Sequence, residues 1–514
     1  MPVIRHILIP NSYHDSVFLM ELSRGLGERP GVEAAGVMMG TPANVAVLVE
    51  SGLLAERPEG VSPADLVIAA AAGTDVEAAE ALEWATRSLT APAGRTPPDS
   101  PSGGAPAPRV GRWQWRELPE SARLALISTP GRYAAAEAWK ALRAGRHVAL
   151  FSDHVPVEDE VALKQAARDR GLLVMGPECG TAIIGGVPLG FANRLRRGPI
   201  GLIAASGSGL QEVTCLIDRL GSGVSHAIGT GGRDLSAAVG GLTMQQGIDL
   251  LLGDEATRML VLLSKPPDPQ VAASVLRRVA HARKPVVVCF LGGDPEPIEA
   301  AGASVARTLE EAARLAVELA TQRPIPAISA AEVPETPVRQ GEPPLLCGLF
   351  AGGTLAYEAM LVLRAALGPI WSNAPLDSDH RLPETGQLPG HTCLDLGAEE
   401  FTAGQPHPMI DGTRRAARLL DVAADPRVGV ILLDVILGLG SEPDPAGTLL
   451  PAIAQARQIA GRGERTLHVV ASVTGTADDP QPYAAQVEKL TKERVVVAES
   501  NAAAARAAAA LVMA

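Results

Sequence analysis

The stretch Ile203-Ala204-Ala205-Ser206-Gly207-Ser208-Gly209-Leu210-Gln211-Glu212 runs from an apolar strand through a turn of small residues into a helix-compatible segment. A strand that is apolar on both faces is typical of a parallel sheet. Glycine and serine let the backbone N–H groups of the turn approach an anion at the positive end of the helix. The stretch therefore predicts an α/β fold with phosphate or carboxylate binding at Ser206, Gly207, Ser208 and Gly209. A tight turn that serves packing alone is the alternative.

Apolar runs alternate with helical spacing over most of the chain. Strands are expected at Ile4–Ile9, Val32–Met38, Leu66–Ala71, Leu124–Ile127, His147–Phe151, Leu172–Met175, Ile200–Ala204, Ala227–Ile228, Met259–Leu263, Val286–Phe290, Leu345–Phe350, Val428–Asp434, Thr466–Ala471 and Val495–Ala498. This pattern predicts a multi-domain α/β chain in which successive open parallel sheets follow a small N-terminal α/β sandwich. Ligands are expected at the carboxyl ends of the strands.

Two proline-rich segments divide the chain, because proline at such density cannot lie inside helices or central strands. Within the middle block, two parallel sheets are expected to divide near Asn193 to Pro199. The predicted organisation is a sandwich at 1–90, a linker at 91–111, domains at 112–194 and 195–322, a second linker at 323–344, and a domain at 345–514.

The composition restricts the partners. Lys and Arg number 45 against 57 Asp and Glu, a net charge of −12, which argues against nucleic acid or an anionic membrane. The five cysteines form no CxxC pair, so no metal is expected. No long apolar run and no leader-like amino terminus is present in the sequence. We expect a cytoplasmic protein that binds small anionic substrates.

Two further glycine turns repeat the pattern of a strand, a turn and a helix. Gly231, Gly232 and Arg233 follow one short strand, and the Arg233 guanidinium could hold a carboxylate or phosphate with two hydrogen bonds. Arg233 could instead pair with Asp234 or another neighbouring acid. Gly352, Gly353 and Thr354 follow a later strand and are interpreted as a second anion-binding turn.

The segment 390–411, interpreted as a loop, concentrates histidines and carboxylates. His391, Asp395 and His407 are the residue types that proton transfer or orientation of a polar substrate needs. The alternative is a long ordered loop whose histidines satisfy backbone groups. The histidine spacing matches no standard metal-ligand pattern. The sequence also contains no GxxxxGK[ST], GxSxG or HExxH motif, which disfavours NTPase, hydrolase and metalloprotease functions.

The order of these motifs resembles known proteins. The stretches 172–180, 201–209 and 228–234 resemble the α subunit of succinyl-CoA synthetase, and 394–397 with 425–433 are similar to the carboxy-terminal domain of its β subunit. Together with Met38 to Asn44 and Pro406 to Asp411, the chain resembles the FdrA family. The resemblance implies a Rossmann-like, CoA-binding-like domain at 112–194, and flavodoxin-like ligase domains of the α-subunit type at 195–322 and the β-subunit type at 345–514.

The departures from the synthetase bear on function. Where a synthetase has its phosphohistidine loop, this chain reads Gly292-Gly293-Asp294-Pro295-Glu296-Pro297, and the glycine-rich CoA turn is also missing, which leaves CoA binding open. The resemblance to FdrA implies a subunit of an oxamate carbamoyltransferase of purine or allantoin catabolism, with carbamoyl phosphate as substrate, no required cofactor and partner subunits in a hetero-oligomer. The alternatives are a CoA-using acyl-CoA synthetase-like ligase subunit and a non-catalytic scaffold or regulatory subunit.

Overall fold

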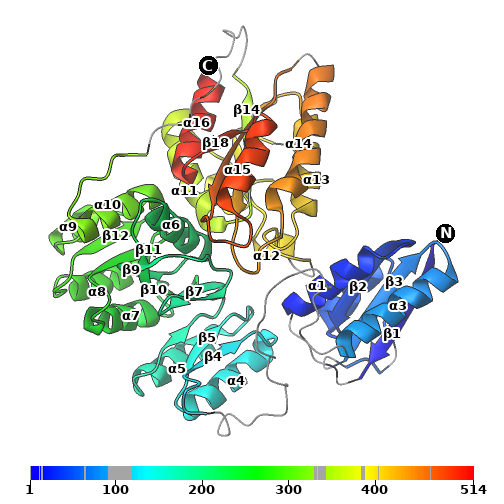
Figure 1. Ribbon diagram of the computed structural model, residues 1–514, viewed down its shortest axis with the longest axis horizontal. Coiled ribbons are helices and arrows are strands. Elements are labelled where there is room, and N and C mark those ends of the chain that lie inside the picture. The colour runs from blue at the N-terminus through cyan, green and yellow to red at the C-terminus, as the bar shows by residue number, and fades with distance from the viewer. Residues whose placement is uncertain are drawn as a thin grey trace. The chain divides into compact units, whose positions relative to one another are not determined.

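The computed structural model describes residues 2–514 except 11, 13–15, 59, 63–64, 91–118, 329–330, 332, 334–342, 384–387, 403–404 and 464. It divides into two compact units, Met1–Ser121 and Ala122–Ala514 (Figure 1). The predicted linker at 91–111 and most of the linker at 323–344 lie outside the described residues. Residues 323–328 are described and form neither helix nor strand.

The N-terminal unit is a three-layer sandwich around a small antiparallel sheet. Its strands lie in the order β1-β3-β2. The bounds are β1 Val3–Ile9, α1 Ser16–Gly27, β2 Val32–Met39, α2 Pro42–Glu50, β3 Leu66–Ala72 and α3 Asp75–Thr90. Every residue of β3 is buried, because Leu66 and Ile68 pack with α1 and α3 while Val67 and Ala69 pack with α2.

The second unit begins with a three-stranded parallel sheet, β4-β5-β6. The bounds are β4 Leu124–Ile127, α4 Gly131–Arg143, β5 His147–Leu150, α5 Val157–Arg168 and β6 Val174–Met175. The strands are short, and their carboxyl ends lead into α4, α5 and the turn at Gly176.

A seven-stranded sheet follows, in the order β13-β12-β11-β9-β10-β7-β8. Its strands are β7 Thr181–Ile184, β8 Val187–Gly190, β9 Arg197–Ala204, β10 Val224–Gly229, β11 Met259–Ser264, β12 Val286–Phe290 and β13 Ser304–Val305, and its helices are α6 Gly207–Arg219, α7 Leu242–Gly253, α8 Pro269–Val279, α9 Glu296–Ala300 and α10 Leu309–Thr321. The five parallel strands have the flavodoxin-like order 2-1-3-4-5. The hairpin β7–β8 was not predicted, and it joins this sheet because Ile183 pairs with Ala227. The two sheets therefore divide before Thr181 and not near Asn193 to Pro199.

The third sheet is fully parallel, in the order β15-β14-β16-β17-β18, which is again 2-1-3-4-5. Its elements are β14 Leu345–Phe350, α11 Gly353–Leu367, the 3-10 helix η1 Ser378–His380, β15 Thr392–Asp395, α12 Glu399–Thr402, α13 Thr413–Ala424, β16 Val428–Ile436, α14 Pro445–Arg462, β17 His468–Thr474, α15 Tyr483–Lys492, β18 Val496–Ala498 and α16 Asn501–Met513. The interpretation of 390–411 as a loop is wrong, because a fully buried edge strand, β15, lies within it.

The two larger sheets share one hydrophobic core. Helices α6 and α10 cover one face of the seven-stranded sheet, α11 and α16 cover one face of the five-stranded sheet, and the four helices pack together (Figure 1). Buried polar groups cross this layer: Glu212 Oε1 on α6 accepts a hydrogen bond from the Asn501 amide at 3.0 Å, and Asn501 Nδ2 donates to Glu358 Oε2 at 2.7 Å. Burial raises the pKa of Glu358 to about 8.

The predicted fold class, an α/β chain with several parallel sheets, is confirmed. Among the described residues, no helix combines the length and apolar character that crossing a bilayer requires.

A buried ionic cluster joins the first parallel sheet to the second. The Lys164 ammonium lies 2.8 Å from Glu160 Oε1 and 2.8 Å from Asp234 Oδ1, donates to the Thr230 carbonyl at 3.0 Å, and its side chain is 1% exposed. Asp234 in turn accepts hydrogen bonds from Thr243 and Met244 at the start of α7. This cluster fixes α5 against the turn after β10.

Lys164→Met should destabilise the unit 122–514 by about 3–5 kcal/mol, because it leaves the buried Asp234 carboxylate without a cation and removes one of the two cations that pair with Glu160. Lys140→Met removes an exposed ion pair with Glu137 and should change stability by less than about 1 kcal/mol. Urea unfolding of both variants checks this. Equal effects of the two substitutions would contradict the role of the cluster.

Candidate functional site

Two helix amino termini face each other where the two flavodoxin-like sheets meet. Ser206 caps α6 by accepting a hydrogen bond from the Gly209 amide at 3.0 Å, and its hydroxyl donates to Thr354 Oγ1 in the first turn of α11 at 2.7 Å. Both turns follow the first strand of a 2-1-3-4-5 sheet, at the switch point where such folds bind ligands. The structure therefore brings the predicted turns 206–209 and 352–354 together.

Glycine is required for this approach. A Cβ atom on Gly352 would lie 2.7 Å from Ser208 Cβ, and one on Gly209 would lie 3.0 Å from Thr354 Cγ2. A Cβ atom on Gly353 would lie 2.4 Å from Asp395 Oδ2. Small residues in both turns thus allow the two helix ends and a carboxylate to meet.

A buried ion pair holds the turn before α11. Asp434, two residues before the end of β16, accepts hydrogen bonds from the Ala351 amide at 2.9 Å and the Gly352 amide at 2.8 Å, and Arg415 Nη2 lies 3.0 Å from its Oδ1. The amides of Gly353 and Thr354, further into the first turn, have no intrahelical acceptor. They remain available to a ligand.

Asp395, at the end of β15, is a buried carboxylate beside the first turn of α11. Burial raises its pKa to about 6, and the Lys265 ammonium and a hydrogen bond from the Gly397 amide act in the opposite direction. Asn373 fixes the backbone by donating to the Asp395 carbonyl and accepting from its amide. Asp395 can therefore exchange a proton near neutral pH.

His407 contributes an uncharged donor to the same region. Burial lowers its pKa to about 4, and its Nδ1 accepts a hydrogen bond from the Met409 amide at 3.2 Å. The neutral ring consequently carries its proton on Nε2. A Cβ atom on Gly397 would lie 2.7 Å from this Nε2, so His407 and Asp395 flank one glycine.

The structure does not bring His391 into this group. Its Nδ1 accepts a hydrogen bond from the Leu346 amide at 3.1 Å, at the start of β14 and before β15, the end of the sheet opposite Asp395. Burial lowers its pKa. His391 satisfies a backbone group, which is the alternative that the sequence left open.

Arg233 is likewise engaged elsewhere. Its Nη2 lies 3.1 Å from the buried Glu160 Oε2 and donates to the Val155 carbonyl at 2.9 Å. Gly231 has a φ of 88°, and a Cβ atom there would lie 2.3 Å from the Pro177 carbonyl, while Gly232 adjoins it in the same turn. The turn 231–233 therefore packs the first parallel sheet against the second.

Three residues of the site were not predicted from the sequence: Lys265, Asn373 and Asp434. Lys265 and Asp434 lie directly at the carboxyl ends of predicted strands, which is the signal that could have identified them. Asn373 follows no strand and gives no such signal.

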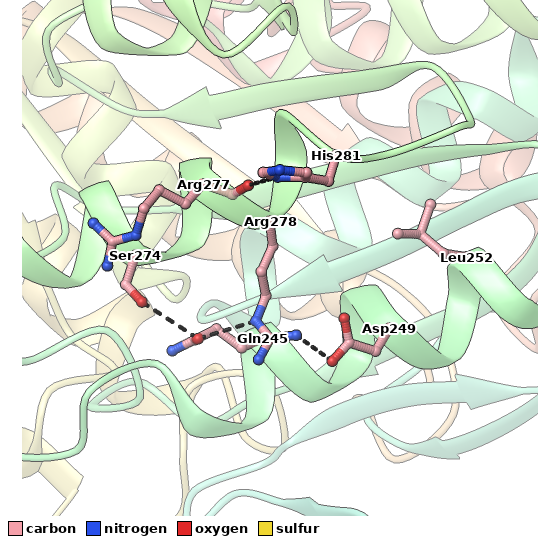
Figure 2. Close-up of a pocket in the computed structure, with 7 residues that line it drawn as sticks. All are labelled: Gln245, Asp249, Leu252, Ser274, Arg277, Arg278 and His281. Atoms are coloured by element: carbon pink, nitrogen blue, oxygen red, sulfur yellow. Dashed lines mark hydrogen bonds and ion pairs between the residues drawn. The ribbon is translucent and has the colours of Figure 1, made fainter.

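A surface depression of about 440 Å³ lies away from these turns, between α7 and α8 (Figure 2). Its polar side chains bind one another: Arg278 Nε donates to Gln245 Oε1 at 3.1 Å and pairs with Asp249. Helices α7 and α8 cover the face of the sheet opposite α6. The depression contains no helix amino terminus with free amides, so we assign the site to the facing turns.

Comparisons with known proteins identify ligase relatives. Residues 349–511 match the family described as CoA-ligase, and residues 1–103 match the one described as AllF, heavy metal-associated domain. The uncharacterized protein YahF of Escherichia coli is 41% identical over 503 residues, which cover 97% of this chain and 96% of that protein.

More distant relatives have named activities. Subunit SauD of the ADP-forming sulfoacetate-CoA ligase of Bilophila wadsworthia is 26% identical over 34% of this chain and 61% of that subunit. Subunit alpha 2 of the ADP-forming succinate–CoA ligase of Archaeoglobus fulgidus is 26% identical over 38% of this chain and 77% of that subunit. The predicted carbamoyltransferase is wrong, because the matched family and these relatives are CoA ligases.

The described residues of the N-terminal unit do not fit a heavy-metal site. The first cysteine of the sequence is Cys179, beyond this unit. Throughout the part of the chain that the structure describes, no three His, Cys, Asp or Glu side chains gather closely enough to hold a metal ion.

Asp395→Asn should stabilise the protein above about pH 6 and leave stability unchanged near pH 4. Because the folded protein holds this proton more tightly than the unfolded chain, the stability due to Asp395 is full below the ordinary pKa of 3.8 and is lost as the pH rises through about 6. The gain is about 3 kcal/mol at most. Thermal unfolding midpoints between about pH 4 and pH 8 measure it.

The exposed Asp379→Asn is the matched control, and its midpoint should follow that of the wild type. If Asp395→Asn also followed the wild type at every pH, the carboxylate would not have the raised pKa that its burial implies.

Proposed function

We propose a function for this chain as a member of the succinyl-CoA synthetase-like family of Escherichia coli YahF, to which it belongs. It is a subunit of an acyl-CoA-forming ligase, and it binds an acyl phosphate between α6 and α11. The observation that carries the proposal is the hydrogen bond of 2.7 Å between the Ser206 and Thr354 hydroxyls, which joins two helix amino termini.

Facing helix ends favour an anion. Each amino terminus acts as about half a positive charge, and its first-turn amides point along the helix axis without acceptors in the preceding turn. Of these amides, that of Gly209 on α6 donates to Ser206. Here the hydroxyls of Ser206, Ser208 and Thr354 lie among these amides. Ser208 and Gly207 are partly or fully exposed, so a ligand can reach the turns. A carboxylate or phosphoryl group matches this set of donors.

The two ionisable residues suit acyl transfer. His407 presents an Nε2–H donor, which can stabilise negative charge on the acyl oxygen as a nucleophile attacks. Asp395, in its ionised form, can accept the proton of an attacking thiol, and its raised pKa places this exchange close to neutral pH. The phosphate that leaves stays opposite the helix amides.

CoA would supply the thiol, and the turn after β4 fits its phosphates. Thr129 Oγ1 is buried there and makes no hydrogen bond within the described residues. Helix α4 begins directly afterwards, and its N-cap, Pro130, supplies no side-chain cap. An unpaired hydroxyl beside uncapped helix amides is a donor set for a phosphate.

The turn after β12, Gly292-Gly293-Asp294-Pro295-Glu296-Pro297, contains no histidine. We therefore propose that a partner subunit activates the carboxylate and that the acyl phosphate reaches this chain already formed. The hetero-oligomer that the resemblance to FdrA implies would supply such a partner subunit.

Ser206→Asp should weaken the binding of inorganic phosphate by more than about tenfold and leave CoA binding intact. Aspartate still caps α6, but its charge opposes an anion between the helices. The matched control is Ser206→Asn, which is similar in size, caps equally well and is uncharged. Isothermal titration calorimetry measures the affinity of each of the three proteins for phosphate and for CoA.

Retained phosphate binding in Ser206→Asp would contradict the site. A wild-type protein that binds neither phosphate nor CoA at millimolar concentration would contradict the ligase function and favour the non-catalytic scaffold.

A further inference from the structure

Lys265 follows β11, the strand beside β9, which leads into the capping serine of α6. Strands β11 and β9 pair in parallel as far as Leu263 opposite Ala204, so Lys265 and Ser206 each lie two residues beyond the last paired residues, at the same edge of the sheet. Neighbouring strands lie about 4.8 Å apart. On its other side, β12 pairs with Ser264 opposite Phe290, which places Lys265 beside the turn at Gly292. Lys265 therefore lies in the loop after β11, at the carboxyl edge of the sheet where the strand order reverses.

Among the residues that the structure describes, no carboxylate binds the Lys265 ammonium. Within the described residues its ammonium forms no ion pair, in contrast to Lys164, Lys140 and Lys489. It lies 5.6 Å from the centre of the Tyr357 ring on α11. The ring holds the lysine toward α11, since a cation is attracted to an aromatic face.

Asp395 is the carboxylate that this ammonium influences most clearly, and the influence is electrostatic and without a hydrogen bond. An ionised Asp395 would cancel much of the positive potential of the two helix ends. Lys265 restores that potential, and it remains only partly buried and open to a ligand.

We propose that Lys265 binds the second negative charge of the ligand, so that the site selects a dianionic phosphoryl group over a singly charged carboxylate. This inference rests on the proposed function and names the substrate class of that site. Helix amides alone serve either anion, whereas a free ammonium at their edge favours the higher charge. Lys265 is a specificity-determining residue.

The test compares Lys265→Met with Lys265→Arg by calorimetric titration with inorganic phosphate and with acetate. The wild type should bind phosphate at least about tenfold more tightly than acetate. Lys265→Met should lose about tenfold or more in phosphate affinity, as expected for one charge-assisted contact, and keep its weak acetate binding. Lys265→Arg should retain most of the preference.

A second readout is independent of ligand. In Lys265→Met, the pH at which Asp395 loses its proton should rise, which shifts the pH dependence of thermal stability upward. Phosphate affinity unchanged in Lys265→Met, while Ser206→Asp abolishes it, would overturn the role of Lys265 and leave the proposed function standing. A wild type that binds no phosphate would overturn both.

Discussion

The packing of α6 and α10 against α11 and α16 is the constraint on which the site depends. It buries one face of each flavodoxin-like sheet in a single core and leaves the amino termini of α6 and α11 in contact. Buried hydrogen bonds from Asn501 to Glu212 and Glu358 fix how the helices are placed along one another, because any shift would leave these polar groups unpaired. Without this layer, each turn would be an ordinary βα connection.

The proposed acyl-transfer chemistry depends on the contact between the amino termini of α6 and α11. Two helix ends concentrate amides and hydroxyls, and Gly352 and Gly353 leave room for Ser208 and Asp395 to approach them. The same burial raises the pKa of Asp395 and keeps His407 neutral. In the function that we propose, the helix ends bind the anion and Asp395 exchanges the proton, which is what transfer of an acyl group from phosphate requires.

The sequence predicted the strands that are apolar on both faces, and hence the parallel sheets and the turns at 206–209 and 352–354. It did not predict the β7–β8 hairpin or β15, because each of these strands has four residues, which is too short to show a clear period. It could not show that Arg233 pairs with Glu160 or that His391 lies at the far end of its strand, since both depend on tertiary packing. The only signal for Lys265 in the sequence is that it follows a predicted strand.

The most direct test of the anion site is the anomalous scattering of tungstate, a phosphate analogue, in crystals of the protein. We predict a peak between the first turns of α6 and α11, within hydrogen-bonding reach of the Ser206 and Thr354 hydroxyls. Tungstate bound only in the depression between α7 and α8, or nowhere on the chain, would contradict the assignment.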